Sequence, residues 1–493
     1  MKIRFLKNSR SGFRQKAGRL GFRKNAALCR DAATTDNPDS CVGDPAGSRG
    51  SVLIIVLWVA IGLVSIALYF ANAMTFELRA SDNRASGLAT DQAIEGAARY
   101  VGYALAMYAT NGAVPLNTQF SCAAVPIGDA RFWLIGRDPS GTPATDPYFG
   151  LIDEASKLNL NTVSTNVLYY LPNMTFDLAQ AIVDWRSTNS SGAYATTYSQ
   201  SGYLEKNAPF ETVDELRLVY GATLDLLVGE DLNANGVLDA NEKDLNGNGQ
   251  VDPGLLEYLT VYTREPNFHS DGTLLTNVNT ARLQDLQSFF QNAGVANANN
   301  LATAVRNYTH PTTGATRTFS GLFNFCLFCR NQNMSSDDFA KIYDDVTTST
   351  NAYIYGRVNV DTASAVVLTA LFTGLNNNMD ESTASAAAQT LISYRTQNPN
   401  NLASVAWVID ALGNNSPVVQ ALAGGDYITT RSFQFTADIA AVGPFGRGYR
   451  RVKFIFDTTD GTPKILYRQD LSRLGWALGE KVRQTLLASN ASQ

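Results

Sequence analysis

The hydrophobic positions of this chain form three patterns, of which the first is a long apolar run. Residues 52–74 read VLIIVLWVAIGLVSIALYFANAM, and no charged residue follows Arg49 until Glu77. About 20 consecutive apolar residues are enough for a helix to cross a bilayer. Apolar positions at helical spacing continue beyond this run, and no proline interrupts them before Pro115. The pattern predicts one helix over residues 51–110, whose first part spans a membrane and whose second part is soluble.

The second pattern is an alternation of apolar and polar residues, which predicts strands. It occurs in residues 130–135, 432–436, 451–457 and 464–468, the last two joined by a turn at residues 459–461. We expect these strands to form an antiparallel sheet with one buried face. A long helix and such a sheet, interrupted by a large helical segment, define an α+β fold.

The third pattern is helical periodicity between the strands, and it is repeated. Lys157-Leu-Asn-Leu-Asn-Thr162 matches Arg357-Val-Asn-Val-Asp-Thr362, and each precedes apolar positions typical of a helical hairpin. Thr276-Asn-Val-Asn-Thr280 is a partial third copy. The predicted organisation is a leader over 1–50, the long helix over 51–110, a first β part over 111–156, an inserted α-helical domain over 157–425, and a second β part over 426–493 that ends in a short helix over 471–487.

A calcium-binding pattern lies inside the helical segment. Residues 231–242 read DLNANGVLDANE and fit the twelve-residue loop D-x-[DN]-x-[DN]-G-x5-E at every defined position. Oxygen ligands packed this densely suit Ca²⁺ better than Zn²⁺. The alternative is an Asn/Gly-rich turn that needs no ion. The predicted ligands are Asp231, Asn233, Asn235, the carbonyl of Val237, Asp239 and Glu242.

A second loop follows at once and makes a tandem over residues 231–255. Residues 244–252 read DLNGNGQVD, which repeats the first nine positions of the pattern. The twelfth position is Leu255, which cannot bind an ion, and Glu257 is a nearby carboxylate that could replace it. Two such loops in tandem favour calcium over a plain turn and indicate a structural role. The predicted ligands here are Asp244, Asn246, Asn248, Gln250 and Asp252.

Charge and composition argue against several kinds of function. The 493-residue chain has a net charge of −5, and its first 50 residues carry eleven basic and four acidic side chains, so residues 51–493 carry −12. An acidic body argues against nucleic acid as a partner. His269 and His310 are the only histidines, which argues against acid–base catalysis by histidine and against a zinc site.

Three cysteines lie outside the first 50 residues. Cys326 and Cys329 form a CxxC pair, a spacing found in redox and metal pairs, but the chain contains no second CxxC. In an oxidising compartment a structural disulfide is the more usual outcome. We expect a disulfide within the set Cys122, Cys326 and Cys329, with Cys326–Cys329 as the candidate pair.

The start of the apolar run resembles a known processing signal. Arg49-Gly50-Ser51, followed by an uninterrupted apolar helix, is similar to the prepilin-peptidase site of type IV pilins and pseudopilins. The resemblance implies cleavage after Gly50 and methylation of Ser51. The fifth residue of the mature chain is normally glutamate in these families. Here it is Ile55, and the loss of this glutamate is typical of the protein K family of type II secretion systems.

A second resemblance to that family lies after the first β part. Asp153-Glu-Ala-Ser-Lys-Leu-Asn-Leu-Asn-Thr162 resembles its D-E-x-x-K-L-N-L-N-T stretch. This resemblance implies a pilin-like fold with an inserted helix-hairpin-helix or SAM-like domain. It also implies a minor pseudopilin, not an enzyme, at the tip of the pseudopilus that exports folded proteins across the outer membrane. The implied partners are minor pseudopilins of the I and J types, the prepilin peptidase and the bacterial inner membrane, with the C-terminal domain in the periplasm.

Two other functions stay open. A minor type IV pilin in adhesion or DNA uptake would contain similar hairpins, although residues 170–174 and 370–375 hold neither paired glycines nor a basic cluster for a phosphate. A membrane-anchored, calcium-dependent hydrolase is the second alternative, although the sequence contains no nucleophile elbow and no HExxH motif.

Overall fold

The computed structural model describes residues 49–140, 145–188, 192–375 and 379–491. The chain divides into two compact units, residues 1–74 and 75–493. Helix α1 (Arg49–Tyr108) contributes to both units and confirms the long helix that the apolar pattern predicts. The predicted leader, apart from its last two residues, lies outside the described residues.

The described part of the first unit is the apolar half of α1. The side chains of residues 52–74 are exposed, apart from a half-buried Ala73. Among the residues that the structure describes, α1 is the one helix that is long and apolar enough to cross a membrane. None of its most apolar window is buried within the chain, which fits a single-pass membrane anchor.

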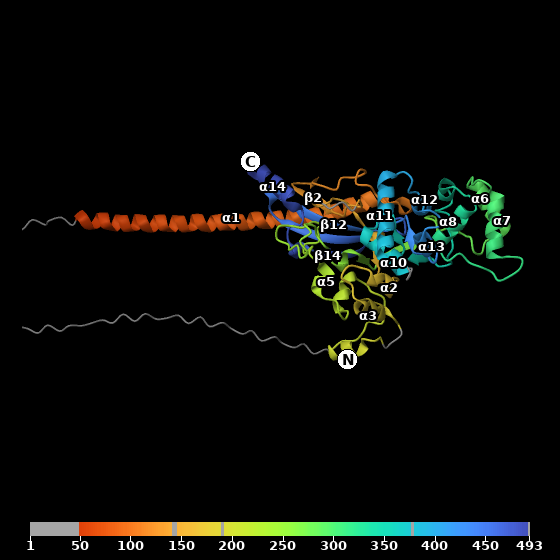
Figure 1. Ribbon diagram of the computed structural model, residues 1–493. Coiled ribbons are helices and arrows are strands. Elements are labelled where there is room, and N and C mark those ends of the chain that lie inside the picture. The colour runs from red at the N-terminus through yellow and green to blue at the C-terminus, as the bar shows by residue number, and fades with distance from the viewer. Residues whose placement is uncertain (1–48, 141–144, 189–191, 376–378, 492–493) are drawn as a thin grey trace, which may run out of the picture. The chain divides into compact units, whose positions relative to one another are not determined.

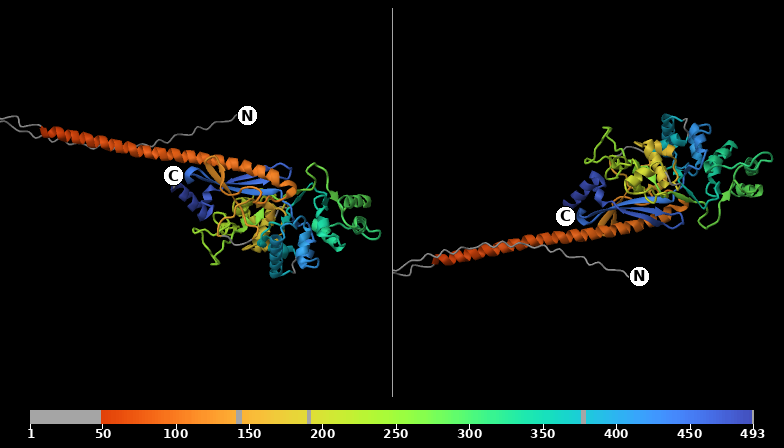
Figure 2. Two further views of the ribbon diagram at one scale, coloured as in Figure 1. Left: turned by 90° about the horizontal axis from the view of Figure 1, so that it is seen from above. Right: turned by 90° about the horizontal axis from the view of Figure 1, so that it is seen from below.

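In the second unit, α1 packs on one face of an antiparallel sheet (Figures 1 and 2). Its buried residues recur at helical spacing, from Ala93 and Ala97 to Val101 and Leu105. The facing side chains of the sheet alternate along their strands, as the period of a strand requires. They are Phe132 and Leu134, Phe435, Ala437, Ile439 and Ala441, and Val452, Phe454 and Phe456.

Strands from both ends of the second unit make this sheet. Its order is β1-β2-β12-β13-β14, and β3 also pairs with β12. The predicted strand over 130–135 is β2, residue for residue. The bounds are β1 Val125–Ile127, β2 Ala130–Ile135, β3 Ile152–Asp153, β12 Gln434–Val442, β13 Tyr449–Asp457 and β14 Lys464–Asp470.

The central strand β12 is buried on both faces, so the prediction of a single buried face is wrong for it. All nine of its residues are buried. Phe435 and Ile439 belong to the core with α1, whereas Thr436 binds Glu154 on the opposite face. The reason is that the helical insertion covers the face that an open sheet would leave in water (Figure 2).

The closing helix begins later than the sequence predicts. The predicted helix starts at Leu471, but the structure has a 3-10 turn, η6 (Ser472–Leu474), and then α14 (Gly479–Ala491). Gly475 between them has a φ of +86°, which a continuous helix does not allow. Ala477 and Leu478 then pack with Trp133 and Ile135 of β2.

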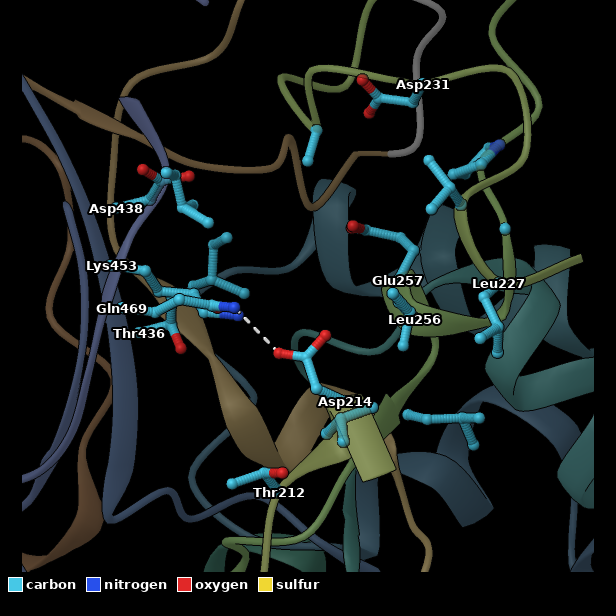
Figure 3. A pocket seen from close by; sticks show the side chains of 18 of the residues that line it. Thr212, Asp214, Leu227, Asp231, Leu256, Glu257, Thr436, Asp438, Lys453 and Gln469 are labelled. Atoms are coloured by element: carbon cyan, nitrogen blue, oxygen red, sulfur yellow. Dashed lines mark hydrogen bonds between the residues drawn. The ribbon is translucent and has the colours of Figure 1, made fainter. Parts of the chain in front are cut away.

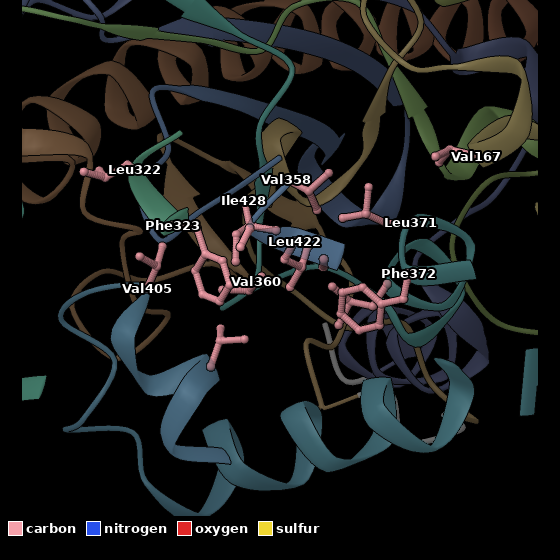
Figure 4. Close-up of a cluster of buried hydrophobic side chains, with 14 of the residues drawn as sticks. Val167, Leu322, Phe323, Val358, Val360, Leu371, Phe372, Val405, Leu422 and Ile428 are labelled. Carbon is pink, nitrogen blue, oxygen red and sulfur yellow. The ribbon is translucent and has the colours of Figure 1, made fainter. Parts of the chain in front are cut away.

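The segment between β3 and β12 forms its own hydrophobic core, whose members run from Leu158 to Ile428 (Figure 4). Its α-helices are α2 Thr165–Tyr169, α3 Phe176–Arg186, α4 Ala195–Gln200, α5 Leu224–Val228, α6 Leu283–Asn292, α7 Ala298–Thr309, α8 Leu322–Asn331, α9 Ser336–Ala340, α10 Ala365–Leu375, α11 Glu381–Gln397, α12 Ala406–Leu412 and α13 Pro417–Leu422. Three 3-10 turns belong to this segment: η2 Glu154–Ser156 at its start, and η3 Val213–Leu218 and η4 Leu255–Glu257 further along. Two others, η1 Thr110–Gly112 and η5 Pro444–Gly446, lie outside the segment.

This segment contains three copies of one unit in its described part, which we call repeats 1, 2 and 3 (residues 158–260, 276–347 and 358–429). Each copy begins and ends with short strands that pair in parallel. These strands are β4 Leu158–Asn159 with β5 Leu259–Thr260, β7 Thr276–Asn277 with β8 Val346–Thr347, and β10 Val358–Asn359 with β11 Ile428–Thr429. A further antiparallel pair, β6 Arg264–Pro266 with β9 Tyr353–Tyr355, links the stretches between the repeats.

The same hydrogen bonds recur in the three repeats. The asparagine of the first strand (Asn159, Asn277 or Asn359) accepts a main-chain N–H from two residues further on, at 2.8–2.9 Å. An arginine in the second helix of each hairpin donates to the carbonyl of the fourth residue after that asparagine. These arginines are Arg186, Arg306 and Arg395, and the acceptors are the carbonyls of Val163, Ala281 and Ala363. The partial third copy seen in the sequence is therefore a complete repeat in the structure.

Candidate calcium centre

The predicted calcium loops occupy one connection of repeat 1. In repeat 2 residues 341–345 join α9 to β8, and in repeat 3 residues 423–427 join α13 to β11. In repeat 1 the equivalent connection, from α5 to β5, runs over residues 229–258. The unit closes without such an insertion in two of its three copies, so the loops are an addition to the repeat.

The first loop is closed by its own acidic side chains. The Asp231 carboxylate accepts the main-chain N–H groups of Asn235 (2.9 Å) and Gly236 (2.8 Å). Gly236 makes the sharp turn with a φ of +82°, a conformation that favours glycine. Glu242, at the twelfth position, accepts the N–H groups of Asn233 (3.2 Å) and Asp239 (3.0 Å). Burial raises the pKa of both Asp231 and Glu242.

The remaining predicted ligands converge on Asp239. Its Oδ2 accepts the side-chain amides of Asn233 (2.6 Å) and Asn235 (2.9 Å). The Asn233 side chain is 3% exposed, and its Oδ1 has no hydrogen-bond partner. Rotating this amide by 180° turns Oδ1 towards Asp239, and two oxygens tolerate such an approach when a cation lies between them. A buried, unpartnered oxygen in a set of oxygen ligands fits Ca²⁺.

The donor set is mixed rather than purely acidic. Among the described residues no group of three or more His, Cys, Asp or Glu side chains is placed to hold a metal. A cation in the first loop would therefore depend on the two asparagines and the Val237 carbonyl as well as on the carboxylates. Such a set of neutral and charged oxygens is typical of calcium loops rather than of zinc sites.

Two arginines that lie outside the helical insertion hold the loop. Arg451 of β13 is completely buried and donates to the carbonyls of Asn233 and Ala234. It also binds the Asp438 carboxylate of β12, with Nε 2.8 Å from Oδ1. Arg137, which follows β2, donates to the Ala234 carbonyl (3.3 Å). Sequence reasoning missed both arginines, because nothing in the local pattern says which remote segment a loop touches.

Glu257, the substitute considered for the second loop, has another partner. Both of its oxygens accept hydrogen bonds from the Arg137 guanidinium, at 2.7 and 2.9 Å. Arg137 also lies 3.9 Å from the Asp231 carboxylate of the first loop. Glu257 therefore belongs to the surroundings of the first loop and does not complete the second.

The second loop has the same internal bonding as the first. Asp244 accepts the N–H groups of Gly247, Asn248 and Gly249 at 2.6–3.2 Å. The side-chain amides of Asn246 and Asn248 donate to Asp252, at 2.5 and 3.1 Å. Gln250 donates its N–H to Asn248. Unlike the first loop, this one is exposed over nearly all of its residues.

A carboxylate from before the motif closes the second loop. Glu230 is buried and accepts the N–H groups of Leu245 (2.6 Å) and Asp252 (3.1 Å). Its own N–H donates to the Asp252 carbonyl, and Gly229 bridges to Pro253. Glu242 holds the ninth-position amide of the first loop in the same way. Glu230 thus occupies the place in the second loop that Leu255 cannot fill.

A cavity of about 190 Å³ lies between repeat 1 and the sheet (Figure 3). Asp231 and Glu257 line it from the side of the loops, and Asp438 and Lys453 line it from the sheet. Gln469 of β14 donates to Asp214 across it, at 2.8 Å. Burial, followed by repulsion from Lys157, lowers the pKa of Lys453.

Asp153 and Glu154 begin the stretch that resembles the protein K family. Their carboxylates bind side chains of repeat 1, of repeat 3 and of the segment that contains β12. Asp153 accepts the side chains of Asn359 (2.9 Å), Thr362 and Ser432. Burial raises the pKa of Asp153 to about 6, although these hydrogen bonds oppose it. Sequence reasoning singled out this stretch only as a resemblance, and its first two residues prove to be buried connectors between the insertion and the sheet.

The hairpin glycine of repeat 3 serves packing. A Cβ on Gly374 would come within 2.4 Å of the Val167 Cα, so α10 of repeat 3 approaches α2 of repeat 1 closely there. Gly374 is buried and does not present its main chain to solvent. This is a different use from that of a phosphate-binding hairpin.

The predicted disulfide between Cys326 and Cys329 is not formed. Both residues lie on α8, both are fully buried in the core of the insertion, and both thiols are free, as is the buried Cys122. Burial raises the pKa of the Cys326 and Cys329 thiols well above the usual value. The helix directs this pair into the core as small apolar side chains, which the CxxC spacing alone does not reveal.

Gly50 and Ser51, the predicted cleavage and methylation sites, lie in the first turn of α1. Processing at this bond stays a prediction, as do the leader and the domain boundaries.

No protein-family model matches this sequence. No curated protein matches it either. Among solved structures, the chain is similar to a chain of the GspK-GspI-GspJ complex from the enterotoxigenic Escherichia coli type 2 secretion system. The match covers 80% of this chain and 99% of that chain, with 10% sequence identity and a TM-score of 0.39.

Proposed function

We propose that this chain is a minor pseudopilin of a type II secretion system, similar to the protein K family. The observation that carries the proposal is that α1 combines an apolar, unburied first half with a second half that packs on the sheet. Its apolar half has no buried face within the chain, whereas residues 93–109 pack on an antiparallel sheet as a pilin helix would. A membrane anchor on an unrelated periplasmic enzyme would not need one helix to do both.

The processing junction supports the same proposal. Arg49-Gly50-Ser51 resembles the prepilin-peptidase site, so the mature chain would begin at a methylated Ser51 in the bacterial inner membrane, with its C-terminal part in the periplasm. The fifth mature residue is Ile55 instead of glutamate. That glutamate neutralises the terminal amine of a neighbouring subunit in the lipid, where an unpaired charge is costly. A subunit without it is suited to the tip of the pseudopilus, beside minor pseudopilins of the I and J types.

We infer a structural rather than an enzymatic role. Among the described residues, the lining of the cavity between repeat 1 and the sheet contains no histidine, cysteine or serine. Its buried carboxylates already have partners: Glu154 binds Thr260 and Thr436, and Asp438 binds Arg451. These two carboxylates are thus engaged in holding the insertion to the sheet, directly through Glu154 and through Arg451 for Asp438.

The test is intact-mass analysis and N-terminal sequencing of the chain purified from membranes of its own host. We expect the mature chain to begin at N-methylated Ser51. Gly50→Val should leave the chain uncut, and Gly47→Val, three residues upstream, should be processed normally. An uncut wild-type chain, or a cut beyond the apolar helix, would remove the pseudopilin proposal.

A second measurement separates the secretion role from a type IV pilus role. Deletion of the gene should trap secreted proteins in the periplasm while adhesion and DNA uptake stay normal. Pseudopilins of the I and J types should co-purify with the wild-type chain. Loss of DNA uptake with normal secretion would favour the minor type IV pilin instead.

A further inference from the structure

We propose that Ca²⁺ binding in the loop Asp231–Glu242 clamps the helical insertion onto the pilin-like sheet, with Arg451 as the positioning residue that connects loop and sheet. The inference does not depend on a role in secretion. It rests on an orphaned buried oxygen in the loop and on the bonds that the loop makes to the sheet.

The first step is the position of the loop. It is an addition to repeat 1, since the equivalent connections of repeats 2 and 3 are short. The added residues do not extend into solvent at the first loop. Asp231, Asn233 and Asn235 are 1–3% exposed. The first loop is therefore built against another part of the second unit.

The second step identifies the residues outside repeat 1 that the first loop contacts. Arg451 of β13 donates to two consecutive carbonyls of the loop, those of Asn233 and Ala234. Asp438 of β12 pairs with Arg451 and holds its guanidinium in place. The contacts thus reach two strands of the sheet, β12 and β13.

The third step is that Asn233 takes part both in the ion site and in the contact with the sheet. Asn233 offers its side chain at the third ligand position, while its carbonyl is the acceptor of Arg451. Its Oδ1 is buried and without a partner, which is costly for a polar atom. Orienting this oxygen onto a cation would fix the same residue whose carbonyl Arg451 binds. Ordering the ligands therefore orders the acceptors of the sheet arginine.

The fourth step concerns charge. Asp231, Asp239 and Glu242 lie on one short loop, and Arg137, which is 3.9 Å from Asp231, is shared with Glu257. Carboxylates on one short loop repel one another, and a cation between them removes that repulsion. We therefore expect the loop to loosen without Ca²⁺ and to release its hold on Arg451.

The experiment is hydrogen exchange on the full chain in detergent, with Ca²⁺ or with a chelator. In the wild type, Ca²⁺ should slow exchange in residues 231–242 and in β13 around Arg451. It should also raise the unfolding temperature by ~3 °C at a concentration 100-fold above its Kd. Mg²⁺ at the same concentration should do neither, since it demands a tighter octahedral shell.

Variants separate the ion site from the clamp. Glu242→Gln should abolish the Ca²⁺-dependent protection of residues 231–242 and β13, and Glu381→Gln, at an exposed glutamate on α11, should leave that protection unchanged. Arg451→Met should still bind Tb³⁺, a luminescent substitute for Ca²⁺, but protection should no longer reach β13. Arg451→Lys covers the case in which the methionine variant does not fold: its single ammonium cannot bind both Asp438 and the two loop carbonyls as the guanidinium does, so protection of β13 should be weaker than in the wild type.

Three results would overturn the inference. The first is a chain that binds no Ca²⁺ at ~10 mM, above the range of weak extracellular sites. The second is protection that stays within residues 231–242 in the wild type. The third is protection that reaches β13 equally in the Arg451 variants.

Discussion

The carboxylate of Glu154 accepts a hydrogen bond from the hydroxyl of Thr436 at 2.6 Å and joins two segments that are 282 residues apart in the sequence. The second oxygen of Glu154 accepts the hydroxyl of Thr260 in repeat 1 (2.5 Å). One buried side chain therefore ties the start of the insertion to the end of its first repeat and to the central strand of the sheet.

Glu154→Gln should destabilise the second unit by ~1–3 kcal/mol, since one acceptor of a buried network becomes a donor without a partner. Burial raises the pKa of Glu154, but Lys157 and the two hydroxyls outweigh it and leave the pKa below the usual value. The contribution of Glu154 is therefore present at neutral pH and lost as pH falls through that lowered pKa. Denaturant unfolding at pH 7 and at acid pH measures this, and equal stability of variant and wild type at pH 7 would contradict it.

Asn279→Ala tests whether the side-chain hydrogen bonds of Asn279 stabilise repeat 2 as much as those of Asn161 stabilise repeat 1. Asn279 accepts the Phe319 N–H (2.8 Å) and donates to the Phe319 carbonyl (3.2 Å), and Asn161 makes the same pair of bonds with Phe210. We expect Asn279→Ala and Asn161→Ala each to cost ~1–3 kcal/mol of unfolding free energy.

Asn299→Ala is the control for this pair. Asn299 is an exposed asparagine on α7, so its replacement should change stability by less than ~0.5 kcal/mol. An effect of Asn279→Ala no larger than that of the control would show that the bonds of repeat 2 are not equivalent to those of repeat 1.

Asp361→Asn should stabilise the chain at alkaline pH. Burial raises the pKa of Asp361 to about 8, although Trp407 and Arg395 oppose the shift. The folded state therefore keeps a proton that the unfolded chain loses near its ordinary value of 3.8, and wild-type stability falls as pH rises between these values. Asparagine is neutral throughout and can accept the same Trp407 N–H.

The gain from Asp361→Asn should be about 1 kcal/mol or more above pH 8 and should vanish near pH 4. Thermal unfolding of both proteins across this range measures it. Asp337→Asn, at an exposed aspartate of α9, should show no such trend. A gain that is constant with pH would mean that Asp361 is ionised in the folded chain at neutral pH.

Glu230→Gln should weaken the second calcium loop alone. It removes the charge that Glu230 brings to the amides of Leu245 and Asp252 and leaves one acceptor oxygen for the two donors. Equilibrium dialysis of the full chain with Ca²⁺ should change from two bound ions to one, with the first loop unaffected. Glu257→Gln, whose carboxylate binds Arg137, should leave the second ion in place. A stoichiometry that Glu257→Gln lowers and Glu230→Gln does not would reverse the assignment.

The local patterns of the sequence were sufficient for the parts of the fold that are defined locally. A 23-residue apolar run and its helical continuation predicted α1, and the period of two predicted β2 and the β13–β14 pair. The calcium pattern named the residues that the first loop brings together, because a turn of twelve residues with glycine at its sixth position brings its own side chains inward. The repeat was also visible, in two full copies and one partial copy.

The sequence by itself thus determined the long helix α1, the strand β2, the β13–β14 pair and the repeated hairpins, since each depends on residues close in the chain. Only the tertiary structure decided that β12 is buried on both faces, that the cysteines stay free in the core of the insertion, that Glu230 closes the second loop, and that Arg137 and Arg451 hold the first. These features depend on which distant segments meet. That choice is made by the packing of whole helices and strands, and no local spacing of residues records it.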